Sequence, residues 1–235
     1  MRLWDDLDVT DPRLLERRIY SMSDVDKYVG LRPGTARRWI DGYVRSGVHY
    51  QPVVRATSTG DDTVTWGELL ETRLLAQFRS SGVALQRLRP AVERLRDDLG
   101  TPYPLVSRRA LLDVEGRELV LRVQDATNLD PDLRLVVVRS GQLVLTPPAA
   151  SFTERATFSG DTITEVRLDD DRVVVLNPRR AMGRPAVGGV PAEVLAEGFR
   201  AGEAIADLAV LYELSISAVE AALRYELQAA DHPAA

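Results

Sequence analysis

The sequence of 235 residues contains no cysteine and only two histidines, His49 and His232. The lack of cysteine excludes a disulfide framework, a thiolate zinc site, an iron–sulfur cluster and a cysteine nucleophile. Two isolated histidines do not make a histidine-rich metal centre, so we expect no metal and no cofactor. No apolar run approaches the ~20 residues that cross a bilayer, and residues 1–6 lack the apolar segment of a signal peptide. We therefore expect a soluble, cytoplasmic protein that makes no membrane contact.

Common catalytic and nucleotide-binding motifs are also absent from the sequence. There is no Gly-x-Gly-x-x-Gly, no phosphate-binding loop ending in Gly-Lys-Ser/Thr and no Gly-x-Ser-x-Gly. The glycine-rich segment 183–189 lacks the lysine and hydroxyl that hold phosphate and magnesium, so we interpret it as a turn. The run Asp169–Asp171 is interpreted as a solvated loop, because consecutive side chains point in different directions. We expect no enzymatic activity.

Charge is distributed unevenly along the chain. Residues 12–56 carry nine basic and four acidic side chains, a local net charge of +5. Residues 97–235 carry 14 basic and 22 acidic side chains, a net charge of −8. Lys27 is the only lysine, and such arginine usage is also typical of a GC-rich coding genome. A basic N-terminal part on an acidic remainder indicates a local anionic partner, with nucleic acid as the first candidate.

Residues 23–42 predict two short helices joined by a tight turn. Ser23 is a suitable N-cap for the first helix, and Gly30 is suited to end it. Pro33 fits the first position of the second helix, which stops near residue 42. Arg37 and Arg38 fall outside the apolar face of this second helix, which is therefore basic on its outer side. The pattern is that of a helix-turn-helix.

A β-hairpin is predicted after this pair of helices. Residues 48–55 and 63–66 are β-prone, and the segment 56–62 between them is rich in turn-forming residues. This hairpin would form a wing with Arg55 near its tip.

Two longer helices are predicted over about 66–80 and 82–99. Leucines and Val92 in the second helix recur at spacings of three and four, so they form a seam barely two heptads long. Packing within the monomer is favoured over a dimeric coiled coil for this seam. Pro90 lies inside the second helix and is expected to kink it.

Residues 20–99 resemble the MerR-type winged helix-turn-helix. An apolar first helix leads to a Gly-apolar turn at Gly30, and Thr-x-Arg-x-aromatic follows at residues 35–39. Residues 66–70 and 81–85 resemble the third and fourth helices of that family. The sequence departs from the family at Arg32, where a capping Ser or Asp is usual, and at Ala36, where Leu is common.

Residues 101–177 are predicted to form a β-rich connector. A tight turn at Ser140-Gly141 would join two of its strands. The strand candidates are Glu118–Val123, Leu133–Val138, Gln142–Leu145 and Arg172–Leu176. The connector would either space the two helical ends or hold a ligand, and the sequence leaves both open.

The C-terminal part predicts three short helices over about 191–200, 203–211 and 215–227. Their outer face is predicted to be acidic, with Glu193, Glu197, Glu203, Asp207, Glu213, Glu220 and Glu226 against Arg200 and Arg224. Such a surface would repel phosphate, so we expect its partner to be a protein.

Mainly glycine, apolar and aromatic residues recur through the segment 178–227, at Gly183–Val187, Gly189–Pro191, Phe199, Gly202, Ile205, Leu208, Ala209, Tyr212, Leu214, Ser215, Val219, Ala222, Leu223, Tyr225 and Glu226. In these residues the segment resembles a small trihelical family that is widespread among prokaryotic antitoxins. The segment Gly188–Pro191 is shorter than the link usual in that family. Together the three parts resemble VapB-type antitoxins, which neutralise a PIN-like VapC-type ribonuclease and repress their own operon.

The sequence thus predicts an α+β fold that is mainly α. Its expected parts are an arm (1–19), a winged helix-turn-helix (20–100), a β-rich connector (101–177), a C-terminal trihelical, helix-turn-helix-like bundle (178–228) and a frayed tail (229–235). We expect a homodimer that binds double-stranded operator DNA and a cognate VapC-type PIN-like toxin. The expected DNA contacts are Arg32, Thr35, Arg37, Arg38, Tyr43, Arg45 and Arg55, and the expected toxin contacts are Arg179, Arg180 and Arg184.

Alternatives to this prediction remain. Each arginine can also be an ordinary solvated surface residue. A transcription regulator whose β connector binds a small-molecule effector is the main rival to the antitoxin, and a purely structural adaptor is a third possibility.

Overall fold

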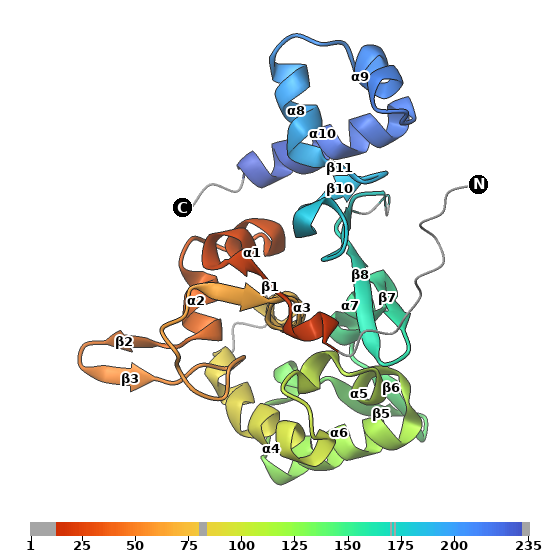
Figure 1. Ribbon diagram of the computed structural model, residues 1–235. Helices are drawn as coiled ribbons and strands as arrows, with labels where there is room; N and C mark the ends of the chain where they lie inside the picture. The colour runs from red at the N-terminus through yellow and green to blue at the C-terminus, as the bar shows by residue number, and fades with distance from the viewer. Residues whose placement is uncertain (1–12, 80–83, 170, 172, 232–235) are drawn as a thin grey trace.

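The computed structural model describes residues 13–79, 84–169, 171 and 173–231 and has a mixed α/β fold in which helices predominate (Figure 1). The helices are α1 (Met22–Val29), α2 (Thr35–Ile40), α3 (Trp66–Gln77), α4 (Arg89–Leu99), α5 (Arg108–Leu112), α6 (Val114–Ala126), α7 (Pro147–Arg155), α8 (Ala192–Arg200), α9 (Ile205–Leu211) and α10 (Ile216–Asp231). The strands are β1 (Arg18–Ser21), β2 (Tyr43–Arg45), β3 (Val48–Tyr50), β4 (Thr63–Thr65), β5 (Val136–Arg139), β6 (Gln142–Leu145), β7 (Ala156–Ser159), β8 (Thr162–Arg167), β9 (Val175–Leu176), β10 (Ala186–Val187) and β11 (Val190–Pro191). None of these helices is long and apolar enough to cross a membrane.

Two hydrophobic cores organise the chain. The larger core extends from Leu14 to Leu176, so the N-terminal helices and the middle of the chain share one interior. The smaller core lies among α8, α9, α10 and the strands beside them. An antiparallel five-stranded sheet, in the order β11-β10-β9-β8-β7, connects the two, because Val166 on β8 packs in the first core and Val187 on β10 in the second.

The two N-terminal helices lie close to where the sequence predicts them. The N-cap of α1 is Ser21 rather than Ser23, and it forms a capping box with Asp24. Gly30 ends α1 in the left-handed region, at φ 72°. The predicted arm is wrong over its described residues, because Leu14 is 1% exposed and β1 pairs with β4. Residues 1–12 lie outside the described residues.

The predicted hairpin between residues 48–55 and 63–66 is wrong. The strand β3 pairs instead with β2, and β4 pairs with β1. Ser46 and Gly47 form the turn of the β2–β3 hairpin with φ values of 50° and 75°. This hairpin extends away from the body of the molecule directly after α2 (Figure 1).

The two longer helices pack within the monomer, as favoured from the sequence. The apolar stripe of α3 is buried, and so are Leu88, Val92 and Leu95 in the segment that follows. Pro90 does not kink a helix, because a 3-10 helix (Leu85–Leu88) precedes it and α4 begins around it. Proline in the first helical turn removes no intrahelical hydrogen bond.

The connector contains more helix than predicted. The predicted strand Glu118–Val123 is part of α6, because the buried positions Gly116, Val120, Val123 and Gln124 recur at helical spacing. The β5–β6 hairpin forms as predicted, with Ser140 and Gly141 in its turn. The hairpin of β7 and β8 was not predicted, although Thr162, Ile163, Thr164 and Val166 after Gly160 are β-branched.

The three C-terminal helices occupy the predicted stretches. Ser215 accepts a hydrogen bond from the backbone N–H of Ala218 and so caps α10. One residue of the predicted acidic face is misplaced, because Glu226 is 7% exposed and forms an ion pair with Lys27 of α1 at 3.4 Å. The predicted frayed tail is too long, since α10 continues to Asp231. Residues 232–235 lie outside the described residues.

Candidate nucleic-acid interface

The N-terminus of α2 is held by a side chain of the preceding helix. Asp26 on α1 is 6% exposed, and its Oδ2 accepts a hydrogen bond from the backbone N–H of Gly34 at 2.6 Å. Its Oδ1 accepts one from the N–H of Ala36 at 2.7 Å. The first N–H groups of a helix have no intrahelical acceptor. Asp26 supplies the side-chain acceptors that a capping Ser or Asp at the position of Arg32 would provide. Sequence spacing gave no indication of this cap, because Asp26 is eight and ten residues from its donors.

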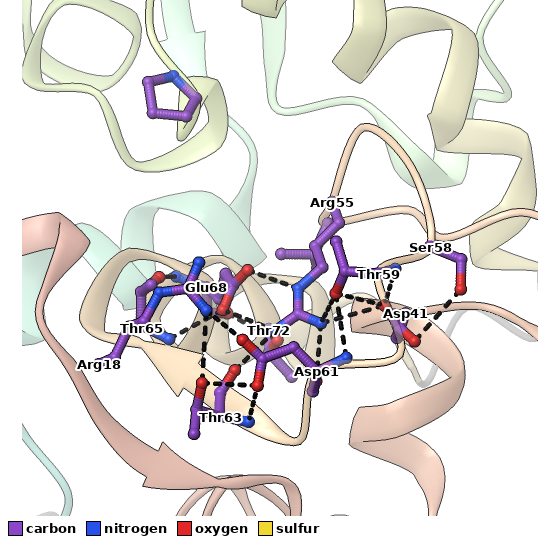
Figure 2. Close-up of polar contacts among 12 residues, drawn as sticks. Arg18, Asp41, Arg55, Ser58, Thr59, Asp61, Thr63, Thr65, Glu68 and Thr72 are labelled. Atoms are coloured by element: carbon purple, nitrogen blue, oxygen red, sulfur yellow. Dashed lines mark hydrogen bonds and ion pairs between the residues drawn. The ribbon is translucent and has the colours of Figure 1, made fainter.

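The C-terminus of α2 is fixed by Asp41, as Figure 2 shows. Its carboxylate accepts hydrogen bonds from the backbone N–H of Thr59 at 2.7 Å and of Gly60 at 3.0 Å. Burial alone would raise the pKa of Asp41, but these bonds and the bond from Arg55 hold that pKa below its usual value. The loop around residues 58–60 is thereby drawn onto the end of α2.

Arg55 lies at the centre of the same network and is 8% exposed. Its guanidinium donates to Glu68 Oε1 at 2.7 Å and to Asp41 Oδ1 at 3.0 Å. It also donates to the backbone oxygen of Thr63 at 2.7 Å. Burial would lower the pKa of Arg55, yet the two carboxylates outweigh it and raise that pKa, so the side chain stays cationic.

The prediction that Arg55 lies near a wing tip and contacts phosphate is therefore wrong. Two buried carboxylates, Asp41 and Glu68, need a buried cation, and Arg55 is that cation. Its guanidinium ties the end of α2 to the start of α3. Charge counting along the sequence does not separate such an internal arginine from a surface one.

The remaining basic residues of the predicted site lie on the surface around α2. Arg32, Arg38 and Arg45 are exposed, whereas Arg37 is partly exposed and forms an ion pair with Asp62. Arg38 also donates from Nε to the backbone oxygen of Gly34 at 3.1 Å. All four side chains come from α2, the turn before it or the hairpin after it.

Two shallow hollows bring several of these residues together. Thr35, Arg38 and Tyr43 line one hollow of about 190 Å³. Arg37 and Tyr43 line a second of about 130 Å³. The Tyr43 ring stacks on Tyr50 across the hairpin, with ring centroids 4.6 Å apart. The sequence reasoning named Tyr43 but missed its strand, although the Ser46-Gly47 turn was a usable signal.

The predicted toxin contacts lie together before α8, in two different settings. Arg184 forms an ion pair with Glu193 of α8, whereas Arg179 and Arg180 are exposed. Among the residues that the structure describes, no group of three or more His, Asp or Glu side chains is arranged to hold a metal ion.

Comparison with known proteins defines the class of the N-terminal part first. Residues 18–92 match the family described as "Putative DNA-binding HTH domain". This match begins at β1 and includes α1, α2, the hairpin and α3. The chain therefore carries an N-terminal helix-turn-helix domain of that family.

Similarity to individual proteins extends over nearly the whole chain. "Uncharacterized protein Rv2308" of Mycobacterium tuberculosis is 36% identical over 229 residues, which cover 94% of each chain. "Putative antitoxin VapB45" of the same organism is 31% identical over 187 residues, 73% of this chain and 77% of that protein. The crystal structure of Rv2018 from Mycobacterium tuberculosis has a TM-score of 0.72 and 26% identity, and the match covers 88% of this chain and 98% of that chain. The chain belongs to the protein family that includes Rv2308 and the antitoxin-like VapB45.

Proposed function

We propose that this protein is an antitoxin that binds operator DNA through α2 and a VapC-type PIN-like ribonuclease through its C-terminal part. The helix-turn-helix match and the relative named as an antitoxin support this proposal. One observation carries it: buried carboxylates, Asp26 and Asp41, hold both ends of α2, while Arg38 on its outer side is exposed. A short helix fixed at both ends with basic side chains outward is suited to the major groove of DNA.

The outer side chains of α2 and its flanks have different proposed roles. Arg37 and Arg32 would donate to guanine edges, which accept two hydrogen bonds from one guanidinium. Thr35, Arg38, Tyr43 and Arg45 would contact phosphates and fix the register of the helix on the duplex. Arg37 would exchange its ion pair with Asp62 for a base, so Asp62 competes with DNA for this residue.

Operator binding by one such domain would read only a few base pairs. We propose that a homodimer binds an inverted repeat upstream of the gene and so represses its own operon.

Fluorescence anisotropy with duplex DNA from that upstream region tests the DNA-binding part. Arg37→Ala is expected to lose about 1–3 kcal/mol of discrimination between the operator and a scrambled duplex. Arg38→Ala should weaken binding to both duplexes equally. It should also make the slope of the logarithm of the binding constant against the logarithm of salt concentration less steep by about 1. Arg122→Ala, an exposed residue of α6, is the control and should change neither. If Arg37→Ala and Arg38→Ala bind both duplexes as the wild type does, this assignment of α2 is wrong.

The C-terminal helices supply the proposed protein-binding surface. Val210 and Leu211 at the end of α9 are 81% and 64% exposed, and Ile216 at the start of α10 is 53% exposed. Exposed apolar side chains at the end of one helix and the start of the next are candidates for a protein-interaction site. Acidic residues nearby, including Asp207 on α9 and Glu213 in the turn before α10, would suit the basic RNA-binding surface of a ribonuclease.

Arg179, Arg180 and Arg184 have a second proposed role in this complex. One of them would reach the metal-binding acids of the toxin. Arg179 and Arg180 are exposed, and Arg184 would exchange its ion pair with Glu193 for these acids. Co-purification of the full chain with the product of the adjacent gene tests the complex. Leu211→Asp should weaken it, whereas Leu227→Asp, an exposed leucine of α10 outside this group, should not. Failure of the intact chain to form any complex would overturn the toxin-binding part.

A further inference from the structure

A cavity of about 360 Å³ lies where the N-terminal domain meets the C-terminal helices. Its wall combines α1, α3 and α10, which are far apart in the sequence. Its volume falls within the ~300–1,000 Å³ range of small-molecule sites. The lining residues are Asp26–Leu31, Arg73, Gln77, Leu168, Tyr225 and Gln228.

Arg73 is the unusual group in this wall. Its guanidinium donates to two backbone oxygens, of Tyr28 at 3.3 Å and of Arg167 at 3.2 Å. Among the described residues no carboxylate forms an ion pair with it. A guanidinium has five N–H groups, so three of them are left for another acceptor.

Burial lowers the pKa of Arg73 to about 10, and the nearby charge of Arg155 adds to this effect. Arg73 therefore remains a cation at neutral pH. A largely buried cation without an anionic partner is costly, so an anion that enters the cavity would gain an interaction that the chain itself does not provide.

Tyr225 lines the same wall, and its hydroxyl is buried with no hydrogen-bond partner in the described structure. Burial raises the pKa of Tyr225, so the hydroxyl stays protonated and is a donor. Arg73 and Tyr225 thus line the same cavity from α3 and α10.

The rest of the lining indicates what kind of anion fits. Lys27 forms an ion pair with Glu226, and Asp26 accepts hydrogen bonds from backbone N–H groups, so Arg73 is the cation of the wall that has no carboxylate partner among the described residues and suits one negative charge. Val29, Leu31 and Leu168 supply apolar surface beside it. We propose that Arg73 and Tyr225 bind the carboxylate of a small organic acid whose apolar body contacts Val29, Leu31 and Leu168. Arginine pairs with carboxylate through two parallel hydrogen bonds, which the three available N–H groups permit.

The site does not depend on DNA or toxin binding by this chain. It does lie beside the group that positions α2, because Asp26 lines the cavity and caps that helix. Of the β-rich connector (101–177), for which the sequence left a ligand-binding role open, Leu168 contributes to this wall.

Isothermal titration calorimetry of the full chain with sodium benzoate tests the proposal, at an ionic strength held constant with sodium chloride. Benzoate has the carboxylate and the apolar body, whereas benzamide has the same shape without the charge. We expect saturable binding of one benzoate per chain and at least about tenfold weaker binding of benzamide, because hydrogen bonds to charged groups are the stronger ones.

Two variants locate the site. Tyr225→Phe removes one hydroxyl and leaves the core intact. It should weaken the binding of benzoate about fivefold, as the loss of one hydrogen bond does. Arg73→Met should abolish binding. Arg117→Met is the matched control, because Arg117 also donates to backbone oxygens, those of Leu111 and Leu143, away from the cavity. The proposal is overturned if benzoate does not bind saturably, if benzamide binds equally well, or if Tyr225→Phe binds benzoate as the wild type does.

Discussion

The carboxylate of Asp26 and the backbone N–H of Ala36 are joined by a buried hydrogen bond of 2.7 Å, across the turn between α1 and α2. The other carboxylate oxygen accepts from Gly34, so one side chain satisfies two N–H groups at the start of α2. The angle between the two helices of the helix-turn-helix therefore depends on one residue of the first helix.

Replacement of Asp26 by Ala should destabilise the protein by about 1–3 kcal/mol, because it leaves these two donors without an acceptor. Urea unfolding followed by circular dichroism measures the change. Asp132→Ala, at an exposed position, is the control and should stay within about 0.5 kcal/mol of the wild type. A wild-type unfolding midpoint for Asp26→Ala would show that Asp26 does not support α2.

Arg55 should behave as a structural residue and not as a DNA contact. Arg55→Met keeps much of the side-chain volume but leaves Asp41 and Glu68 buried without their cation, which costs about 3–5 kcal/mol. Arg45→Met on the exposed hairpin should leave stability nearly unchanged while it reduces the salt dependence of DNA binding. The opposite result would be a stable Arg55→Met variant whose DNA binding depends less on salt concentration. It would mean that Arg55 contacts DNA and is not a structural residue.

The contrast between these two arginines shows what the sequence can predict. The end of α1 at Gly30 and the apolar stripe of α3 follow local rules of capping and periodicity, so they were predictable. The starts of α1 and α2 were each misplaced by about two residues, since α1 is capped by Ser21 and α2 begins at Thr35. The partners of Arg55 come from α2 and α3, and no spacing rule connects them. The same holds for Asp26, whose hydrogen-bond donors lie at the start of a different helix, and for Arg73, whose cavity exists only after α10 packs beside α1.

Glu71 on α3 should make stability depend on pH. It is fully buried, its Oε1 accepts from the backbone N–H of Leu105 at 2.9 Å, and its Oε2 has no partner in the described structure. Burial raises the pKa of Glu71 from 4.5 to about 8, and Glu68 adds to this, while Leu105 and Arg96 act in the opposite direction. Between these two pH values the folded state holds a proton that the unfolded state has released, so its contribution to stability falls as pH rises.

Glu71→Gln retains an oxygen for Leu105 and has no charge to bury. The difference in unfolding free energy between this variant and the wild type should therefore shift in favour of the variant between about pH 5 and pH 9. Unfolding curves in urea at several pH values measure this difference. A difference that is independent of pH would mean that Glu71 does not titrate in this range.

Gly116 allows α6, which contains the wrongly predicted strand Glu118–Val123, to pack closely against α5. A Cβ at this position would lie 1.8 Å from the backbone oxygen of Arg109, which side-chain movement cannot relieve. Alanine improves helix propensity by about 1 kcal/mol over glycine, but the backbone displacement should cost more, so Gly116→Ala is expected to destabilise by at least about 1 kcal/mol net. Glu115→Ala, its exposed neighbour in α6, should remain within about 0.5 kcal/mol of the wild type. A stabilised Gly116→Ala would mean that propensity, and not the close approach of Arg109, decides this position.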